Sequence, residues 1–313
     1  MFAVSRDTGS TVWTFGEEGP DRPLDDPEWT AAWKTHALTE QRVFAASDHG
    51  DVVAIDVATG GVVWRKATAQ QIACLAAGKD QLVVGVEAPN RISLLFLDAN
   101  TGRISSECGH DEASSIELLA VRRESLVCLL SKSLICLDLA RPEMRASVTS
   151  PERFIPSTLQ SAGDRLVLSP DGKRLACYEK AGLRLAWQSD VIWSRPEERR
   201  WVQASGMMVF VAADYELSAF CLGDGRRVWQ IRIPKLSRVL PPRLNDQAII
   251  AVAEGEGNET RRFQILAIAQ NSGKRLGDDL VTEPLKTLDE VHLRDRSIIL
   301  TSGQQLIGYG PDH

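Results

Sequence analysis

The sequence predicts an all-β fold, a β-propeller of four-stranded blades, and three observations predict it. A segment recurs along the chain at intervals of about 40 residues, the spacing of one propeller blade. Each copy holds short apolar runs bounded by turn residues, as strands do. The apolar residues also lack the i, i+3, i+4 spacing of a helical repeat. Because 313 residues suit one large all-β unit, we expect a single domain over residues 1–313.

The recurring segment is an apolar strand, often an Asp, a turn with Gly, and a second strand that ends in Trp. Its clearest copy starts at Ala54 and ends at Trp64, with Thr59 and Gly60 in the turn. Glycine suits such a turn because it adopts positive φ without steric cost. The copies begin at Ala3, Ala54, Phe96, Cys136, Cys177, Ala219, Ala267 and Gly308, the last of them partial.

The tryptophans that end these segments are predicted to pack between neighbouring blades. An indole ring is large enough to fill the gap that widens toward the outside of a propeller. Ser106 replaces the Trp in the copy that begins at Phe96. Ligand stacking is the alternative role for the four structural blade-packing residues, which are Trp13, Trp64, Trp187 and Trp229.

Further apolar runs predict the remaining strands of each blade. Every copy after the first is preceded by such a run, and each run follows a weaker one that fits an innermost strand. The seven runs cover residues 43–46, 82–84, 126–130, 165–168, 209–211, 249–252 and 298–300. A seven-bladed ring is the simplest closure, with the N-terminal outer strand near residues 10–15 completing the C-terminal blade. The surplus third strand near residues 2–4 keeps an eight-bladed ring as the alternative.

The repeat resembles the PQQ-like (quinoprotein-type) propeller repeat, which reads as an apolar strand, Ala-Leu-Asp, a Thr-Gly turn and a strand ending in Trp. Residues 3–13 and 54–64 carry the resemblance most clearly, and it extends over essentially the whole chain. Proteins with this repeat include the quinoprotein alcohol dehydrogenases and the non-enzymatic assembly lipoprotein BamB. The resemblance therefore implies either a BamB-like scaffold or a cofactor-binding enzyme.

An enzyme with PQQ is disfavoured by the sequence. The resemblance implies a Ca²⁺ ion held by Glu, Asn and Asp, a base Asp and, in many cases, an adjacent Cys-Cys pair. This sequence has no Cys-Cys pair, and none of its residues can be assigned a catalytic role. We expect no catalytic residue and neither PQQ nor Ca²⁺ as cofactor.

One cluster of metal-ligand residue types stands out, and we expect no metal there. Cys108, His110, Asp111 and Glu112 are close in sequence, but their spacing matches no known zinc pattern. The cluster falls where a solvated loop between blades is expected.

Charge and cysteine content restrict partners and location. The net charge is −6, so general nucleic-acid binding is disfavoured, and the basic stretch from Arg226 to Arg243 is interpreted as a solvated face. No apolar stretch is long enough for a membrane span. Cys128 and Cys136 flank a short turn, which leaves a disulfide open, but we expect reduced core cysteines. The absence of a signal sequence favours the cytoplasm, with the periplasm as the alternative if a signal has been removed.

The segment 192–201 departs from the repeat and is the candidate protein-interaction site. Trp and Arg are the residues most enriched at interface hot spots. The candidates are Trp193, Arg195, Arg199, Arg200 and Trp201, and packing of both tryptophans beneath the loop is the alternative. The sequence thus predicts a non-catalytic scaffold that binds protein partners within a larger assembly. The alternatives are a PQQ- or sugar-binding enzyme or sensor with a central funnel site, and a propeller module of a larger protein.

Overall fold

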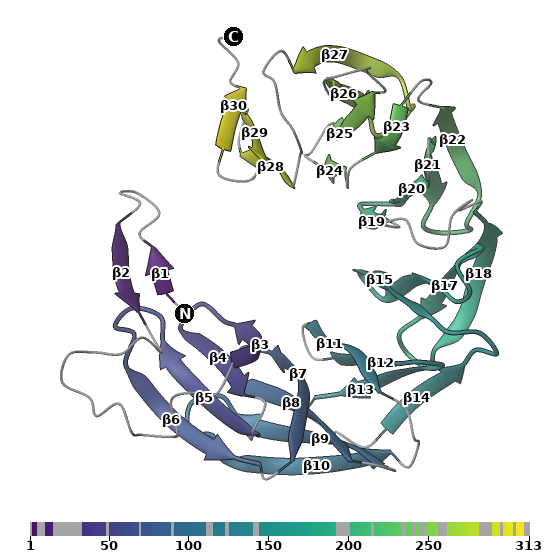
Figure 1. Cartoon of the computed structure of the whole chain (residues 1–313). Helices are drawn as coiled ribbons and strands as arrows, with labels where there is room; N and C mark the ends of the chain where they lie inside the picture. Colours follow the sequence, from purple (N-terminus) through teal and green to yellow (C-terminus); the bar gives the residue numbers. More distant parts are fainter. Residues whose placement is uncertain are drawn as a thin grey trace. The chain divides into compact units, whose positions relative to one another are not determined.

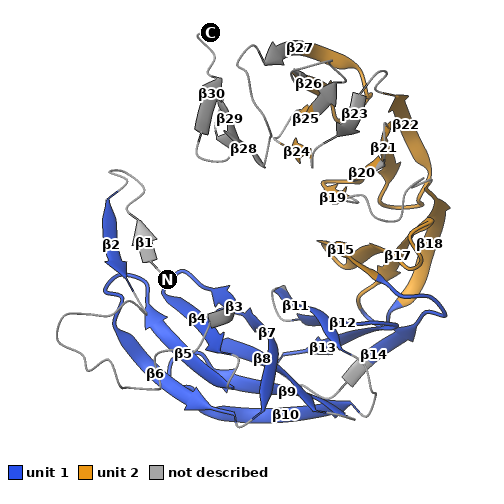
Figure 2. Ribbon diagram, viewed as in Figure 1, with its two compact units in different colours: residues 1–154, 181–183 blue, residues 155–180, 184–313 orange. Residues whose placement is uncertain are grey.

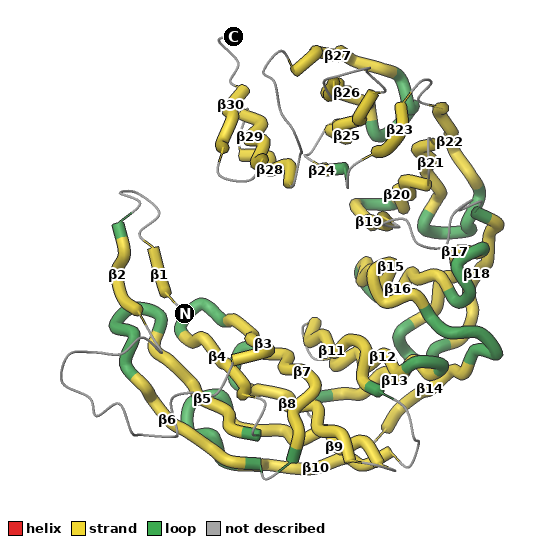
Figure 3. Tube along the Cα trace, viewed as in Figure 1, coloured by secondary structure: helices red, strands yellow, loops and turns green. Residues whose placement is uncertain are grey.

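A computed structural model of the chain shows β-strands joined by turns and loops (Figure 3). It describes residues 2–4, 10–14, 33–47, 50–68, 70–88, 91–110, 115–122, 125–139, 144–191, 201–213, 216–232, 236–239, 242–244, 248–255, 262–281, 290–294, 297–302 and 305–309. The chain divides into two compact units (Figure 2), and each is described by itself.

The first unit comprises Met1–Phe154 and Ala181–Leu183, and its described strands form four antiparallel sheets (Figure 1). The first is a two-stranded sheet of β1 (Phe2–Val4) and β2 (Thr11–Thr14). Three four-stranded sheets follow in chain order. They are β3 (Trp33–Leu38), β4 (Arg42–Ser47), β5 (Asp51–Asp56) and β6 (Val62–Ala67); β7 (Gln71–Ala77), β8 (Gln81–Ala88), β9 (Arg91–Asp98) and β10 (Ile104–His110); and β11 (Ile116–Arg122), β12 (Ser125–Leu130), β13 (Ser133–Asp138) and β14 (Met144–Thr149).

The second unit comprises Ile155–Lys180 and Arg184–His313 and repeats the same sheet. Two sheets are four-stranded: β15 (Ile155–Ala162), β16 (Arg165–Ser169), β17 (Arg174–Glu179) and β18 (Arg184–Asp190); and β19 (Trp201–Ser205), β20 (Met208–Ala213), β21 (Glu216–Cys221) and β22 (Arg227–Arg232). In the next sheet β23 (Leu236–Val239) and β24 (Arg243–Leu244) both pair with β25 (Ala248–Gly255), which is followed by β26 (Arg262–Ala269) and β27 (Arg275–Val281). The last sheet has β28 (Glu290–Arg294), β29 (Ser297–Ser302) and β30 (Gln305–Tyr309).

These strands confirm the all-β fold class and the strand order predicted for each blade. Every one of the eight copy anchors lies in a strand, and so does every one of the seven preceding apolar runs. Within the described residues, the C-terminal sheet has three strands, in agreement with the prediction. The N-terminal outer strand, β2, pairs with β1, and the two strands form a separate sheet. Closure by that strand, the count of seven blades and the single domain stay predictions.

The hydrophobic core lies between the faces of consecutive sheets within each unit. Phe44 and Ala54 of one sheet share a core cluster with Leu82 and Leu97 of the next. The second and third strands of the sheets are buried on both faces, which explains why they read as continuous apolar runs instead of alternating ones. Packing sheet on sheet in this way positions the turns at the strand ends.

Each described outer strand carries a β-bulge at the same repeat position. In β6 the pairing shifts from Ala54 with Trp64 to Ile55 with Val62, which leaves Val63 as the extra residue. A bulge twists an edge strand and makes it a poor template for pairing with another chain. The extra residues in the seven outer strands are Val12, Val63, Ser105, Arg145, Ala186, Val228 and Leu276.

Candidate functional site

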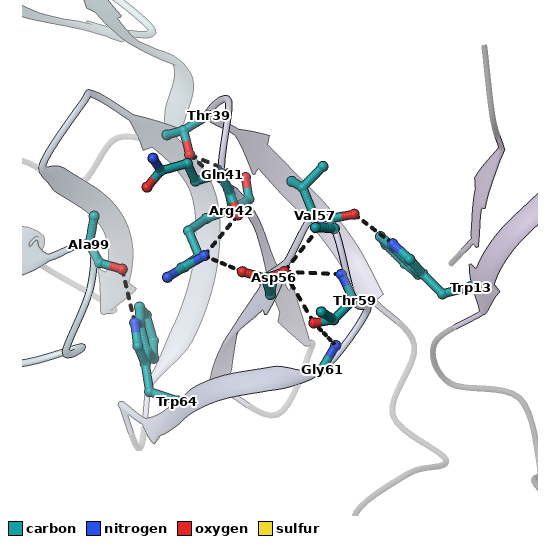
Figure 4. Close-up of polar contacts among 11 residues, drawn as sticks. Trp13, Thr39, Gln41, Arg42, Asp56, Val57, Thr59, Gly61, Trp64 and Ala99 are labelled. Carbon is teal, nitrogen blue, oxygen red and sulfur yellow. Dashed lines mark hydrogen bonds and ion pairs between the residues drawn. The ribbon is translucent and has the colours of Figure 1, made fainter. Parts of the chain in front are cut away.

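Four outer-strand tryptophans each dock on the turn of the next sheet within the same unit. In every case the indole Nε1–H donates a hydrogen bond to a backbone carbonyl in that turn. The pairs are Trp13 to Val57 (2.8 Å), Trp64 to Ala99 (3.0 Å), Trp187 to Leu222 (2.8 Å) and Trp229 to Gln270 (2.7 Å). Figure 4 shows the first two of these contacts on either side of the Asp56 turn.

The turn that receives each indole requires glycine for two reasons. Gly60 has a φ of 72° and Gly225 has the same value, a backbone conformation that other residues rarely adopt. A Cβ atom added at Gly60 would lie 2.6 Å from Cγ of Trp13, and one added at Gly225 would lie 2.5 Å from Cε3 of Trp187. The indole therefore covers the glycine directly, and the Gly and Trp of the repeat form one contact.

The aspartate of the repeat closes the same turn by hydrogen bonding. One carboxylate oxygen of Asp56 accepts hydrogen bonds from the Ala58 and Thr59 amides and from the Thr59 hydroxyl, at 3.0–3.1 Å. The hydrogen bonds from Thr59 lower the pKa of Asp56, and Arg42 adds an ion pair at 2.6 Å (Figure 4). With its acceptor capacity committed to its own turn, Asp56 orders the backbone and is poorly suited to act as a general base.

The turns of the first unit line a groove of about 610 Å³, which we call the turn groove. It is formed by the turn between β3 and β4, the turn between β7 and β8, and the start of the turn after β9. Its lining residues are Leu38, Thr39, Glu40, Gln41, Arg42, Ala77, Gly78, Lys79, Asp80, Ala99, Asn100 and Val121. Leu38 is 62% exposed, although it is apolar. Acidic, basic and amide groups surround it, so the groove offers hydrogen-bonding groups and one uncovered apolar side chain.

The turn groove was not found by reasoning from the sequence. Its residues come from three separate turns and from Val121 of β11, and they become neighbours only when consecutive sheets pack. A single signal was available, the apolar residue Leu38 at the end of a strand and directly before the polar residues Thr39, Glu40 and Gln41.

The predicted interaction segment is described only at its end. Trp193, Arg195, Arg199 and Arg200 lie outside the described residues. Trp201 begins β19, is half-buried and packs against the core cluster of the second unit that contains Phe210 and Trp229.

The prediction of a solvated loop at Cys108 and His110 is wrong. Both residues lie on β10, where they are half-buried and line a cavity, whereas Asp111 and Glu112 lie outside the described residues. The strand continues further than expected because β9 and β10 pair as far as Ile92 and His110. In the described part of the chain, no group of three or more His, Cys, Asp or Glu residues is arranged to hold a metal ion.

All six cysteines are free thiols. Cys128 pairs with Ile135, and Cys136 pairs with Val127, so the two cysteines are offset by one residue in the ladder. Since successive side chains point to opposite faces of a sheet, the two thiols face away from each other. This register excludes the hairpin disulfide that the sequence left open.

The sequence matches the family model described as outer membrane protein assembly factor BamB, over residues 2–123 and 145–297. The chain belongs to this family. That membership confirms the PQQ-like propeller repeat inferred from the Asp, Gly and Trp positions. No curated protein matches the sequence of this BamB-family chain.

Three solved structures are similar to this BamB-family protein. BamB from Moraxella catarrhalis has a TM-score of 0.62 and 13% identity, and the match covers 98% of this chain and 89% of that one. The dihydro-heme d1 dehydrogenase NirN, in complex with DHE, has a TM-score of 0.66 and 16% identity over 99% of this chain and 68% of that one. The computationally designed protein Ika8 has a TM-score of 0.55 and 12% identity over 90% and 96%. At these identities the likeness shows the propeller fold alone.

The described residues include no helix that is long and apolar enough to cross a membrane.

Proposed function

We propose that this protein is a non-catalytic scaffold that binds partner proteins within a larger assembly, with the turn groove as one docking surface. The family match carries the proposal, because the family is described as an assembly factor and the match spans most of the chain. Antiparallel sheets with fixed turns are suited to displaying surface residues to a partner.

The turn groove supports binding of an extended segment of a partner protein. Its volume of about 610 Å³ lies within the range of ligand sites in proteins. Leu38 offers an apolar contact that a partner's apolar side chain would cover, while Gln41, Lys79 and Asn100 offer donors to a partner's backbone carbonyls. An apolar anchor within a polar rim is the usual anatomy of an interface.

We propose the segment with Trp193, Arg195, Arg199, Arg200 and Trp201 as a second contact with a protein partner. Its support is compositional, since Trp and Arg dominate interface hot spots. The packing of Trp201 into its unit would anchor the end of the segment and leave Trp193 and the arginines as the contacting residues.

We further propose that the scaffold works without PQQ or Ca²⁺. The lack of a Cys-Cys pair supports this, as does the use of the repeat aspartates in their own turns. The likeness to NirN makes a cofactor-binding enzyme the first alternative function. A propeller module of a larger protein is the second alternative.

Among the possible locations, we propose the periplasm, because the family description places that factor's work at the outer membrane. The cytoplasmic expectation drawn from the sequence has no support from the family.

A co-purification experiment with matched variants tests the scaffold and its docking surface. Leu38→Asp places a charge at the groove, and Leu276→Asp is the control because Leu276 is 59% exposed and lies on β27 of the other unit. The tagged chain is purified from its native cells, and the co-purifying proteins are quantified. We expect a partner that is retained by wild type and by Leu276→Asp and is lost with Leu38→Asp.

The outcomes separate the parts of the proposal. Equal retention by both Leu variants would rule out the turn groove, and Trp193→Ala then tests the second contact. If neither the wild type nor any variant retains a protein above the level of a denatured control, the result argues against the scaffold itself.

A further inference from the structure

A small apolar cavity lies between the sheet β7–β10 and the sheet β11–β14 of the first unit, and it is separate from the turn groove. Its volume is about 130 Å³. Five of its walls are aliphatic side chains that are each at most 5% exposed, namely Ile92, Leu94, Leu130, Ile135 and Leu137. Cys108, Gly109 and His110 of β10 line it on the side of the outer strand.

The cavity lies near a departure from the repeat at Ser106, two residues before the first lining residue of β10, Cys108. Ser106, Cys108 and His110 alternate along the half-buried face of β10 that looks toward the next sheet. In β6 the same row begins with Trp64, whose ring packs against Phe44 with the centroids 5.9 Å apart. The side chains of Ser and Cys are much smaller than an indole ring. Ser106 therefore supplies less side-chain volume than Trp64 does at the same position of the repeat.

The walls of the cavity offer very little to a water molecule. A buried water requires two to four polar partners, whereas these walls are aliphatic apart from Gly109, one imidazole and two thiols. Burial raises the pKa of Cys108 and of Cys128, so both groups are uncharged thiols at neutral pH. An uncharged thiol behaves as a small apolar group.

We propose that this cavity binds a small, uncharged, apolar molecule of about the size of benzene. An engineered aliphatic cavity of about 150 Å³ stays dry and takes up benzene or xenon, and the present cavity has a similar volume and similar walls. The lining residues include no carboxylate, lysine or arginine, so a carboxylate or ammonium ligand would lose its hydration for little return. The bound molecule would fill the space that the aliphatic walls leave between the two sheets.

Binding is tested on the full chain by ¹⁹F NMR titration with fluorobenzene, with fluorobenzoate as the charged comparison. We expect saturable binding of fluorobenzene and no binding of fluorobenzoate. Cys108→Leu fills the cavity and should abolish the binding. Cys221→Leu is the matched control, since Cys221 is likewise half-buried but lies on β21 of the other unit, and it should leave the binding unchanged.

Thiol alkylation of the unmodified chain places the ligand without relying on a variant. Iodoacetamide labelling is followed by peptide mass spectrometry, so that Cys108 and Cys221 are read separately in one sample. Benzene at ten times its dissociation constant should slow labelling of Cys108 about tenfold and leave that of Cys221 unchanged. The proposal is overturned if fluorobenzene fails to bind saturably, or if it binds while Cys108 reacts at its original rate.

Discussion

The docking of Trp187 on Gly225 gives the sharpest test of how the sheets are held together. Trp187 is buried, and replacement of a buried Trp by Ala costs about 3–5 kcal/mol of the free energy of unfolding. The hydrogen bond is the smaller part of this cost. The Leu222 carbonyl also accepts from Arg165 at 3.2 Å, so it keeps a partner when the indole is removed. Trp187→Phe, which loses the bond but keeps a ring, should therefore cost about 1 kcal/mol.

A second substitution tests the contact from the other side. Gly225→Ala would place a Cβ atom 2.5 Å from Trp187, and it would put an alanine at a φ of 72°. The left-handed conformation costs about 1–2 kcal/mol, and overpacking against the ring costs about 1–3 kcal/mol more. In the Trp187→Ala background the ring is absent, so only the conformational cost should remain.

Urea denaturation followed by far-ultraviolet circular dichroism measures all of these variants, and it gives the coupling between the two sites. We expect the double variant to be more stable than the sum of the single effects predicts, by about 1–3 kcal/mol. Additivity within about 0.5 kcal/mol would refute a direct contact between ring and glycine. Equal losses for Trp187→Phe and Trp187→Ala would refute the claim that packing outweighs the hydrogen bond.

Three further predictions use the same assay or a thermal melt. Leu183, buried and at a φ of 49°, occupies the repeat position of a turn glycine, so Leu183→Gly should destabilise the chain less than Leu183→Ala by about 1 kcal/mol; the reverse order would contradict this. Hydrogen bonds from Thr101 lower the pKa of Asp98, so its ionised form stabilises the fold above about pH 4, and this contribution is lost as the pH falls through the lowered value. Stability should thus fall less on acidification in Asp98→Asn than in wild type, and equal pH profiles would count against it. PQQ should leave the melting temperature unchanged with or without Ca²⁺, whereas a saturable rise would show a cofactor site.

The fold could be predicted from the sequence because its signals are local. Gly60, Trp64 and Asp56 stand within nine residues of one another, and each is required by the conformation of one turn or by one docking contact. The second strands are buried on both faces, so they appear in the sequence as continuous apolar runs without alternating polar residues. Such repeated local requirements fix strand order without any knowledge of long-range contacts.

The sites could not be predicted because they depend on contacts between sheets. Leu38, Lys79 and Asn100 are far apart in sequence and meet only in the turn groove. Cys108 and His110 looked like polar loop residues, since a strand with Gly109 in it and polar residues on both sides carries little strand signal. Their position is set by pairing with β9, where Leu94 lies opposite Cys108.

In two places the repeat changes at both positions of its Trp and Gly pair. The Trp position of β14 holds Ala146, and the glycine position of the turn in the following copy holds Leu183, so a small residue replaces the large one and a large residue replaces the small one. Leu183 accepts a strained φ in that turn, which indicates that its buried side chain contributes more to stability than the strain costs. The Trp position of β10 holds Ser106, and the glycine position of the following copy holds Pro142 in the sequence. A cavity begins two residues further along β10, at Cys108. The exchange at Leu183 puts a buried leucine where four other turns have glycine, whereas an apolar cavity stays unfilled along the strand of Ser106. An unfilled apolar cavity beside a changed position of the repeat is therefore where we expect a ligand.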